Sequence, residues 1–222
     1  MERYRMHAGE APGRRTPAGK PKAERPAPGR ALRRQYGGLM ALLLAGAAFG
    51  AAYGGVFSAG TAGRGFFLQS ILTADAASMG FFRLSAVSFF PVALLLCAGC
   101  LFGFCAVGLP FEIALPALLG GYIGVGMSGI YRAYGAKGLG ICAVFLLPQA
   151  VLSALSILAA SREGIRFSAS VGAAVFHAGP APSIEQVRAF CVKYAVCFAI
   201  VAAASGVQAA SVMLFAKLFF AA

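Results

Sequence analysis

The chain has 222 residues, of which 59% are hydrophobic and only 12% are charged. A soluble domain carries about 25% charged residues, so this composition excludes an ordinary soluble globular protein. The apolar residues gather in blocks of roughly 20 residues, the length that crosses a bilayer. They predict an all-α, polytopic membrane bundle with no room for a separate enzymatic domain.

The net charge of +12 is concentrated at the N-terminus. Residues 1–36 contain ten of the 19 Lys and Arg residues, five prolines and few large apolar side chains, so they cannot bury a core. We expect a disordered basic tail that either attracts the headgroups of membrane lipids or only sets the topology. No aromatic side chains alternate with the arginines, so nucleic acid is not an expected partner.

Residues 37–222 are predicted to form the transmembrane domain, with five spans at about 37–57, 84–108, 110–131, 138–160 and 190–216. The apolar segment 167–179 is too short for a span and ends in the turn-forming sequence PAPS, so it is assigned to a loop over residues 161–189. The positive-inside rule then predicts a cell-membrane protein with a cytoplasmic N-terminus and an extracytoplasmic C-terminus.

Small residues recur at four-residue spacing within three of the spans. Such spacing lets helix backbones approach closely enough for dispersion contacts in lipid. It predicts helix packing either within one chain or between the chains of a homo-oligomer. The residues are Gly46, Gly50, Gly54, Gly99, Gly103, Gly120 and Gly124.

The longest external segment, residues 58–83, contains Phe67 and Ile71 at the i, i+4 spacing of one helical face. We expect this face either to lie on the membrane surface or to contact a partner protein.

Polar residues inside the spans require partners, because hydrocarbon does not solvate them. Glu112 and Lys193 lie near the inner ends of two spans and are predicted to pair with each other, the alternative being that each reaches separately to the interface. Pro148 frees a carbonyl near Val144, which the amide of Gln149 or another helix can satisfy. Gln149, with Gln208, is therefore predicted to form a kinked polar helix contact, a partner-docking site or part of a substrate pathway.

Catalytic, cofactor and metal sites are not expected. The GVGMSG sequence at 124–129 lies in a predicted span without the strand that a dinucleotide site requires. The six cysteines lie in or at the edges of spans, where a thiol behaves as a small apolar group. With two histidines and seven acidic residues in the chain, a catalytic set is hard to assemble, and we expect a protein that is not an enzyme.

The chain resembles the stage II sporulation protein M family over about residues 36–216. The resemblance rests on the basic N-terminus, the small-residue first span LLLAGAAFGAAYGGVF, the turn at Gly108–Pro110 and the segment GAKGLGICAVFLLPQAVLSALSILAAS with its central Pro148–Gln149. Gln208 stands where the family commonly carries a glutamate.

By this resemblance the protein would be a non-enzymatic membrane scaffold of engulfment during sporulation. It would hold two peptidoglycan-remodelling enzymes, stage II sporulation proteins D and P, at the septal membrane. The alternative is a small membrane transporter, or a transporter subunit, with a polar site at mid-membrane depth.

Overall fold

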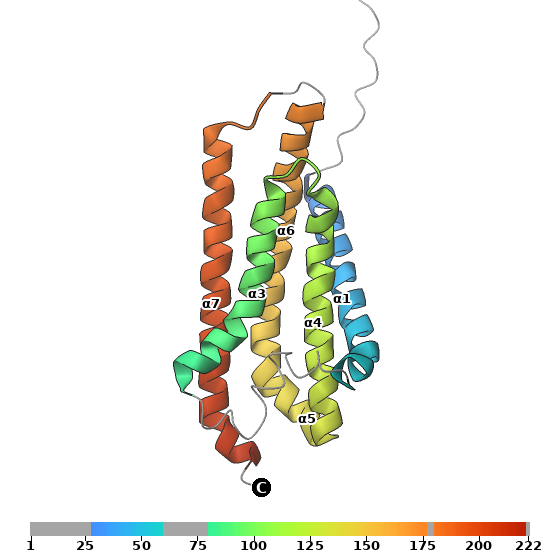
Figure 1. The fold of residues 1–222 in the computed structure, drawn as a ribbon, viewed down its shortest axis with the longest axis vertical. Helices are drawn as coiled ribbons and strands as arrows, with labels where there is room; N and C mark the ends of the chain where they lie inside the picture. The colour runs from blue at the N-terminus through green and yellow to red at the C-terminus, as the bar shows by residue number, and fades with distance from the viewer. Residues whose placement is uncertain (1–27, 60–79, 177–179, 221–222) are drawn as a thin grey trace, which may run out of the picture.

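The computed structural model describes residues 28–59, 80–176 and 180–220, which form a bundle of helices (Figure 1). No strand occurs in this part of the chain, and the predicted all-α fold class is confirmed. The elements are α1 (Pro28–Ala59), α3 (Phe81–Gly103), α4 (Leu109–Tyr134), α5 (Lys137–Ile141), the π-helical turn η3 (Cys142–Leu146), α6 (Leu147–Phe176) and α7 (Ile184–Phe220).

Five segments of these helices are long and apolar enough to cross a membrane. A helix rises about 1.5 Å per residue, so roughly 20 residues cover the ~30 Å of hydrocarbon. The chain is therefore a multi-pass helical membrane protein. The segments are Gln35–Gly54, Phe81–Gly103, Leu109–Arg132, Lys137–Phe176 and Ile184–Leu214.

The helices are not arranged in sequence order. Helix α4 packs against α1 on one side and against α3 and α6 on the other, and α7 packs against α3 and α6 (Figure 1). Helices α1 and α7 consequently lie at opposite sides of the bundle. We call the end at which α1, α4 and α7 begin the proximal end, and the end at which α3 and α5 begin the distal end.

The contact between α1 and α4 depends on glycine. A Cβ atom added to Gly46 would overlap the carbonyl oxygen of Ala117, and one added to Gly120 would overlap that of Leu43. Gly50 and Gly124 meet backbone atoms of the opposite helix in the same way. The four-residue spacing thus joins two helices of the same chain, backbone against backbone.

Two clusters of buried apolar side chains fill the bundle. The larger one includes Leu96, Leu119, Ile157 and Val201, which come from four different helices. The second lies toward the distal end and joins Leu84 of α3, with α4, α5, η3 and α7 contributing the rest. Helix α4 ends at Tyr134 and is followed by Gly135, whose φ of 57° favours glycine, and the chain turns there into α5.

Two predicted boundaries are wrong. The predicted loop over 161–189 is mostly helix, because α6 continues to Phe176 and α7 begins at Ile184. The 40-residue segment Lys137–Phe176 would measure about 60 Å, twice the hydrocarbon thickness, so its charged end can extend beyond the apolar layer. A capping box starts α7: Ser183 N–H donates to Gln186 Oε1 (3.2 Å) and Gln186 N–H to Ser183 Oγ (3.4 Å).

The predicted boundary of the disordered segment at residue 36 is also wrong. Helix α1 begins at Pro28, where the missing amide hydrogen is no loss, so residues 28–36 of that segment are helical. Residues 1–27 lie outside the described part of the chain.

Candidate functional site

Glu112 is the most deeply buried acidic residue in the described bundle. It lies in the first turn of α4 and its side chain is fully buried. Tyr194 of α7 donates from its hydroxyl toward Glu112 Oε1 (3.4 Å) and toward the carbonyl oxygen of Ala160 in α6 (3.1 Å). Glu112 Oε2 has no hydrogen-bond partner among the described residues.

Glycines on two neighbouring helices make the space for this carboxyl group. A Cβ atom at Gly164 of α6 would overlap the carboxyl carbon of Glu112, and one at Gly103 of α3 would lie 3.5 Å from Oε1. Gly99, one helical turn from Gly103, faces Leu115 and the Tyr194 hydroxyl. The two glycines of α3 that were predicted to pack against another helix therefore also border the Glu112 carboxyl group.

The predicted pair between Glu112 and Lys193 is wrong. Lys193 Nζ lies 2.7 Å from Glu163 Oε2, on the neighbouring helix α6. The Lys193 side chain is 52% exposed whereas that of Glu112 is buried, so the two groups meet different surroundings. The sequence predicts a loop at Glu163, and only the continuation of α6 brings this residue beside Lys193.

Gln149 makes a polar contact between two helices, as one of the predicted alternatives required. Its side chain is buried, and Nε2 donates to the carbonyl oxygen of Ser88 in α3 (3.1 Å). The expected partner was the carbonyl that Pro148 frees near Val144. Instead η3 precedes Pro148, with Leu147 N–H bonded to the carbonyl of Cys142, so the helix widens locally before the proline.

Four further buried polar atoms lack a partner among the described residues: Gln208 Oε1, Ser153 Oγ, Ser161 Oγ and Arg162 Nε. Gln208 lies on α7 and is 2% exposed, and the two serines lie on the buried side of α6. Buried polar atoms in a membrane bundle ordinarily have partners, so each of these is a candidate contact for a ligand or water. Phe67 and Ile71 lie outside the described residues.

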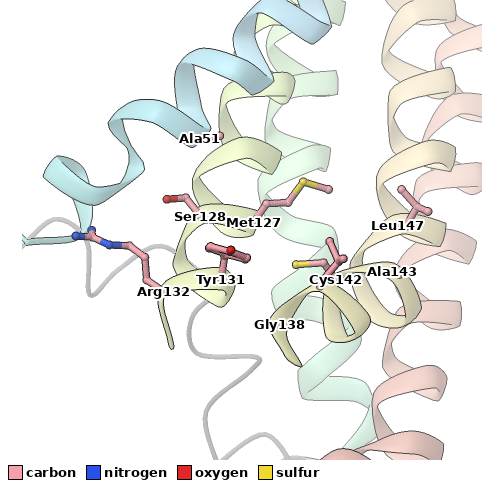
Figure 2. A pocket seen from close by; sticks show the side chains of 10 residues that line it. Ala51, Met127, Ser128, Tyr131, Arg132, Gly138, Cys142, Ala143 and Leu147 are labelled. Carbon is pink, nitrogen blue, oxygen red and sulfur yellow. The ribbon is translucent and has the colours of Figure 1, made fainter. Parts of the chain in front are cut away.

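A groove of about 490 Å³ opens at the distal end of the bundle (Figure 2). Met127 and Tyr131 of α4 line one side, and Cys142 of η3 and Leu147 of α6 line the other. Arg132 extends away from the remaining side chains, so the groove surface is mainly apolar. The small residues Ala51, Gly138 and Ala143 line the same surface.

The two regions offer different chemistry. The Glu112 region holds an acid, a phenol and a backbone carbonyl, which suit hydrogen bonding or proton exchange. The groove suits an apolar partner. The described residues contain no cluster of three or more His, Cys, Asp or Glu side chains that could hold a metal. Sequence reasoning missed Tyr194, Gly164 and Ser88, since no local pattern shows which helices face one another.

Comparison with models of protein families, with curated proteins and with solved structures gives no match. The fold and the sites define the class of the protein, a multi-pass helical membrane protein with a buried acidic group at one end and an apolar groove at the other.

Proposed function

We propose that this protein is a non-enzymatic scaffold of the cell membrane that holds peptidoglycan-remodelling enzymes at the septal membrane during engulfment. The proposal starts from the resemblance to the stage II sporulation protein M family. By that resemblance the partners are stage II sporulation proteins D and P. The observation that carries the proposal further is the apolar groove at the distal end.

The charge distribution supports an orientation with the proximal end in the cytoplasm. Arg162 and Arg166 of α6 and Arg188 of α7 lie in the parts of those helices toward that end, where α1 also begins with Arg30, Arg33 and Arg34. Among the described residues the distal end carries fewer basic residues: Arg83 at the start of α3, Arg132 and Lys137 at the turn between α4 and α5, and Lys217 near the end of α7. The positive-inside rule therefore favours a distal end outside the cell, on the side where wall enzymes work.

The groove has the properties of a surface that receives a membrane helix. Little hydrophobic force pairs helices within lipid, so association depends on close van der Waals packing, which small residues allow. Ala51, Gly138 and Ala143 supply such residues, and Met127 supplies a side chain that adapts to different partner shapes. We assign the groove to an apolar helix of a partner.

Co-expression of the full chain with stage II sporulation proteins D and P, followed by purification in mild detergent, tests this assignment. Ala143→Phe should fill the groove and reduce recovery of the enzymes by at least about tenfold, equivalent to roughly 1.4 kcal/mol. Ala203→Phe is the matched control, because Ala203 is exposed on α7 and does not line the groove. Equal recovery with both variants would exclude the groove as the docking site.

A parallel variant tests the external segment. If Phe67 and Ile71 form the docking face instead, the double substitution Phe67→Ala with Ile71→Ala will weaken recovery while Ala143→Phe leaves it unchanged. If wild-type protein fails to retain either enzyme under conditions that preserve the bundle, the scaffold proposal is wrong.

A small transporter is the second candidate, and one observation favours it. Glu112 is a buried acid that pairs with no cationic side chain in the described part of the bundle, and charged groups at such positions often mark ion or proton pathways. The chain reconstituted into vesicles should then carry a proton flux that Glu112→Gln abolishes. A scaffold predicts no flux that depends on this residue.

A further inference from the structure

A second cavity, of about 250 Å³, lies near the proximal end between α1, α4 and α6. Its walls are apolar where they face the bundle: Leu39 and Leu42 of α1, Ile113 of α4 and Ile165 of α6. Gln35 and Gly38 lie along its α1 side. The cavity is smaller than the ~300–1,000 Å³ that encloses a drug-sized ligand, so it suits part of a larger molecule.

Two arginines complete the lining. Arg162 and Arg166 project from successive turns of α6 toward the cavity. The Arg162 side chain is mostly buried, and its Nε has no hydrogen-bond partner among the described residues. Its guanidinium lies over the Tyr36 ring, 5.2 Å from the ring centroid, and Nη1 donates to the Tyr36 hydroxyl at 3.4 Å. Tyr36 therefore positions the Arg162 guanidinium, which can still donate a hydrogen bond to a ligand.

The local acidic group does not neutralise this charge. Arg162, Arg166 and Lys193 share the carboxylate of Glu163, at 3.6, 3.5 and 2.7 Å respectively. The closest of the three, Lys193, engages Oε2, which leaves both arginines at longer range from Oε1. The cluster therefore carries excess positive charge beside an apolar cavity.

The level of the cavity relative to the membrane identifies the occupant. The apolar part of α1 begins at Gln35, next to the tyrosine that contacts Arg162. The arginines thus lie where headgroups meet hydrocarbon, and Leu39, Leu42 and Ile113 lie on the hydrocarbon side. Guanidinium groups pair well with phosphate, and basic pockets between membrane helices bind anionic headgroups.

We propose that this cavity binds one anionic phospholipid, with its phosphate at Arg162 and Arg166 and the start of an acyl chain along α1. The site depends only on the embedding of the bundle in a membrane and is independent of the scaffold function. A bound lipid would add a link between α1 and α6, whereas α1 as a whole packs mainly on α4.

Native mass spectrometry of the delipidated, detergent-purified full chain tests the site. We expect phosphatidylglycerol to bind more tightly than phosphatidylcholine with the same acyl chains. The ratio of the two affinities should fall about fivefold in Arg162→Gln and about fivefold in Arg166→Gln. A basic residue beside anionic lipid usually contributes about 1 kcal/mol, which corresponds to that factor. Arg188→Gln, an exposed charge on α7 outside the cavity, should leave the preference unchanged.

A pair of glycines supplies a steric control that leaves every charge in place. Gly38 lines the cavity and has open space around an added Cβ, so Gly38→Leu should block lipid binding without disturbing the backbone. Gly37 has equally open surroundings and does not line the cavity, so Gly37→Leu should bind as the wild type does.

Several outcomes would overturn the proposal. Equal affinity for the two lipids, or an undiminished preference in Gly38→Leu, would show that the cavity is not the site. Equal affinity for glycerol 3-phosphate and for phosphatidylglycerol would show an anion site without a lipid. If Arg162→Gln does not fold, Arg166→Gln alone decides the role of charge, because the Arg166 side chain is 60% exposed.

Discussion

Substitution of Gly120 by alanine tests the close approach of α1 and α4. An added Cβ would overlap the carbonyl oxygen of Leu43 and would also lie close to the backbone nitrogen of Ala47. Both obstacles are main-chain atoms of a helix, so no side-chain rotation can relieve them. The two helices must separate, and the neighbouring contact at Gly46 would loosen with them.

The expected cost follows from two opposing effects. Overpacking a close interface costs about 1–3 kcal/mol, and a backbone obstacle places this site at the upper limit. Alanine favours the helix over glycine by about 1 kcal/mol, which offsets part of the loss. We therefore expect Gly120→Ala to lower the free energy of unfolding by about 2 kcal/mol.

Titration of the protein in mixed micelles with a denaturing detergent, followed by circular dichroism, measures this difference. Gly129→Ala is the control, since Gly129 lies in the same helix and no atom of another helix lies within 4 Å of an added Cβ. Combining Gly120→Ala with Leu43→Ala should not restore stability, because the obstacle is the backbone of Leu43. If Gly120→Ala and Gly129→Ala are equally stable, the backbones of α1 and α4 do not meet as described.

Three further predictions concern polar contacts and topology. Gln149→Leu should lower the free energy of unfolding by about 0.6 kcal/mol, the mean for polar contacts between membrane helices, because it removes the hydrogen bond to the Ser88 carbonyl of α3. Unchanged thermal stability in detergent would contradict this prediction. Double-mutant cycles should give a coupling energy of about 0.2–1 kcal/mol between Lys193 and Glu163 and none between Lys193 and Glu112. The reverse result would support the pairing predicted from sequence. In a background without native cysteines, an impermeant thiol reagent applied to intact cells should label a cysteine at position 221 and leave one at position 20 unmodified; equal labelling would contradict the five-span topology.

The apolar spans were predictable because membrane partition depends on the composition of about 20 consecutive residues, whatever they later contact. Gly46, Gly50, Gly120 and Gly124 were recognisable as contact residues for a similar reason, since their spacing alone marks one helical face. The end of α6 was not predictable in this way. Arg162, Glu163 and Arg166 end an apolar run, but α6 continues past them. Hydropathy detects the end of the apolar run and not the end of the helix.

The distal groove and the proximal cavity had no sequence signal. Ala51, Met127 and Cys142 come from three elements, and nothing in their local patterns indicates that they share one surface. The same holds for Tyr36 and Arg162, which are 126 positions apart. Each site exists only because α4 lies between α1 and α6.

The sequence by itself determined the membrane class, the approximate spans, the helical faces that bear glycine and the need of buried polar groups for partners. Tertiary structure decided which partners they have. Sequence predicts the depth of a residue along a span, but pairing also depends on the direction in which the residue faces around its helix and on which helix stands opposite. Glu112 and Lys193 were similar in depth, yet Glu112 faces Tyr194 in the interior and Lys193 meets Glu163 near the surface, because packing among α4, α6 and α7 set those directions.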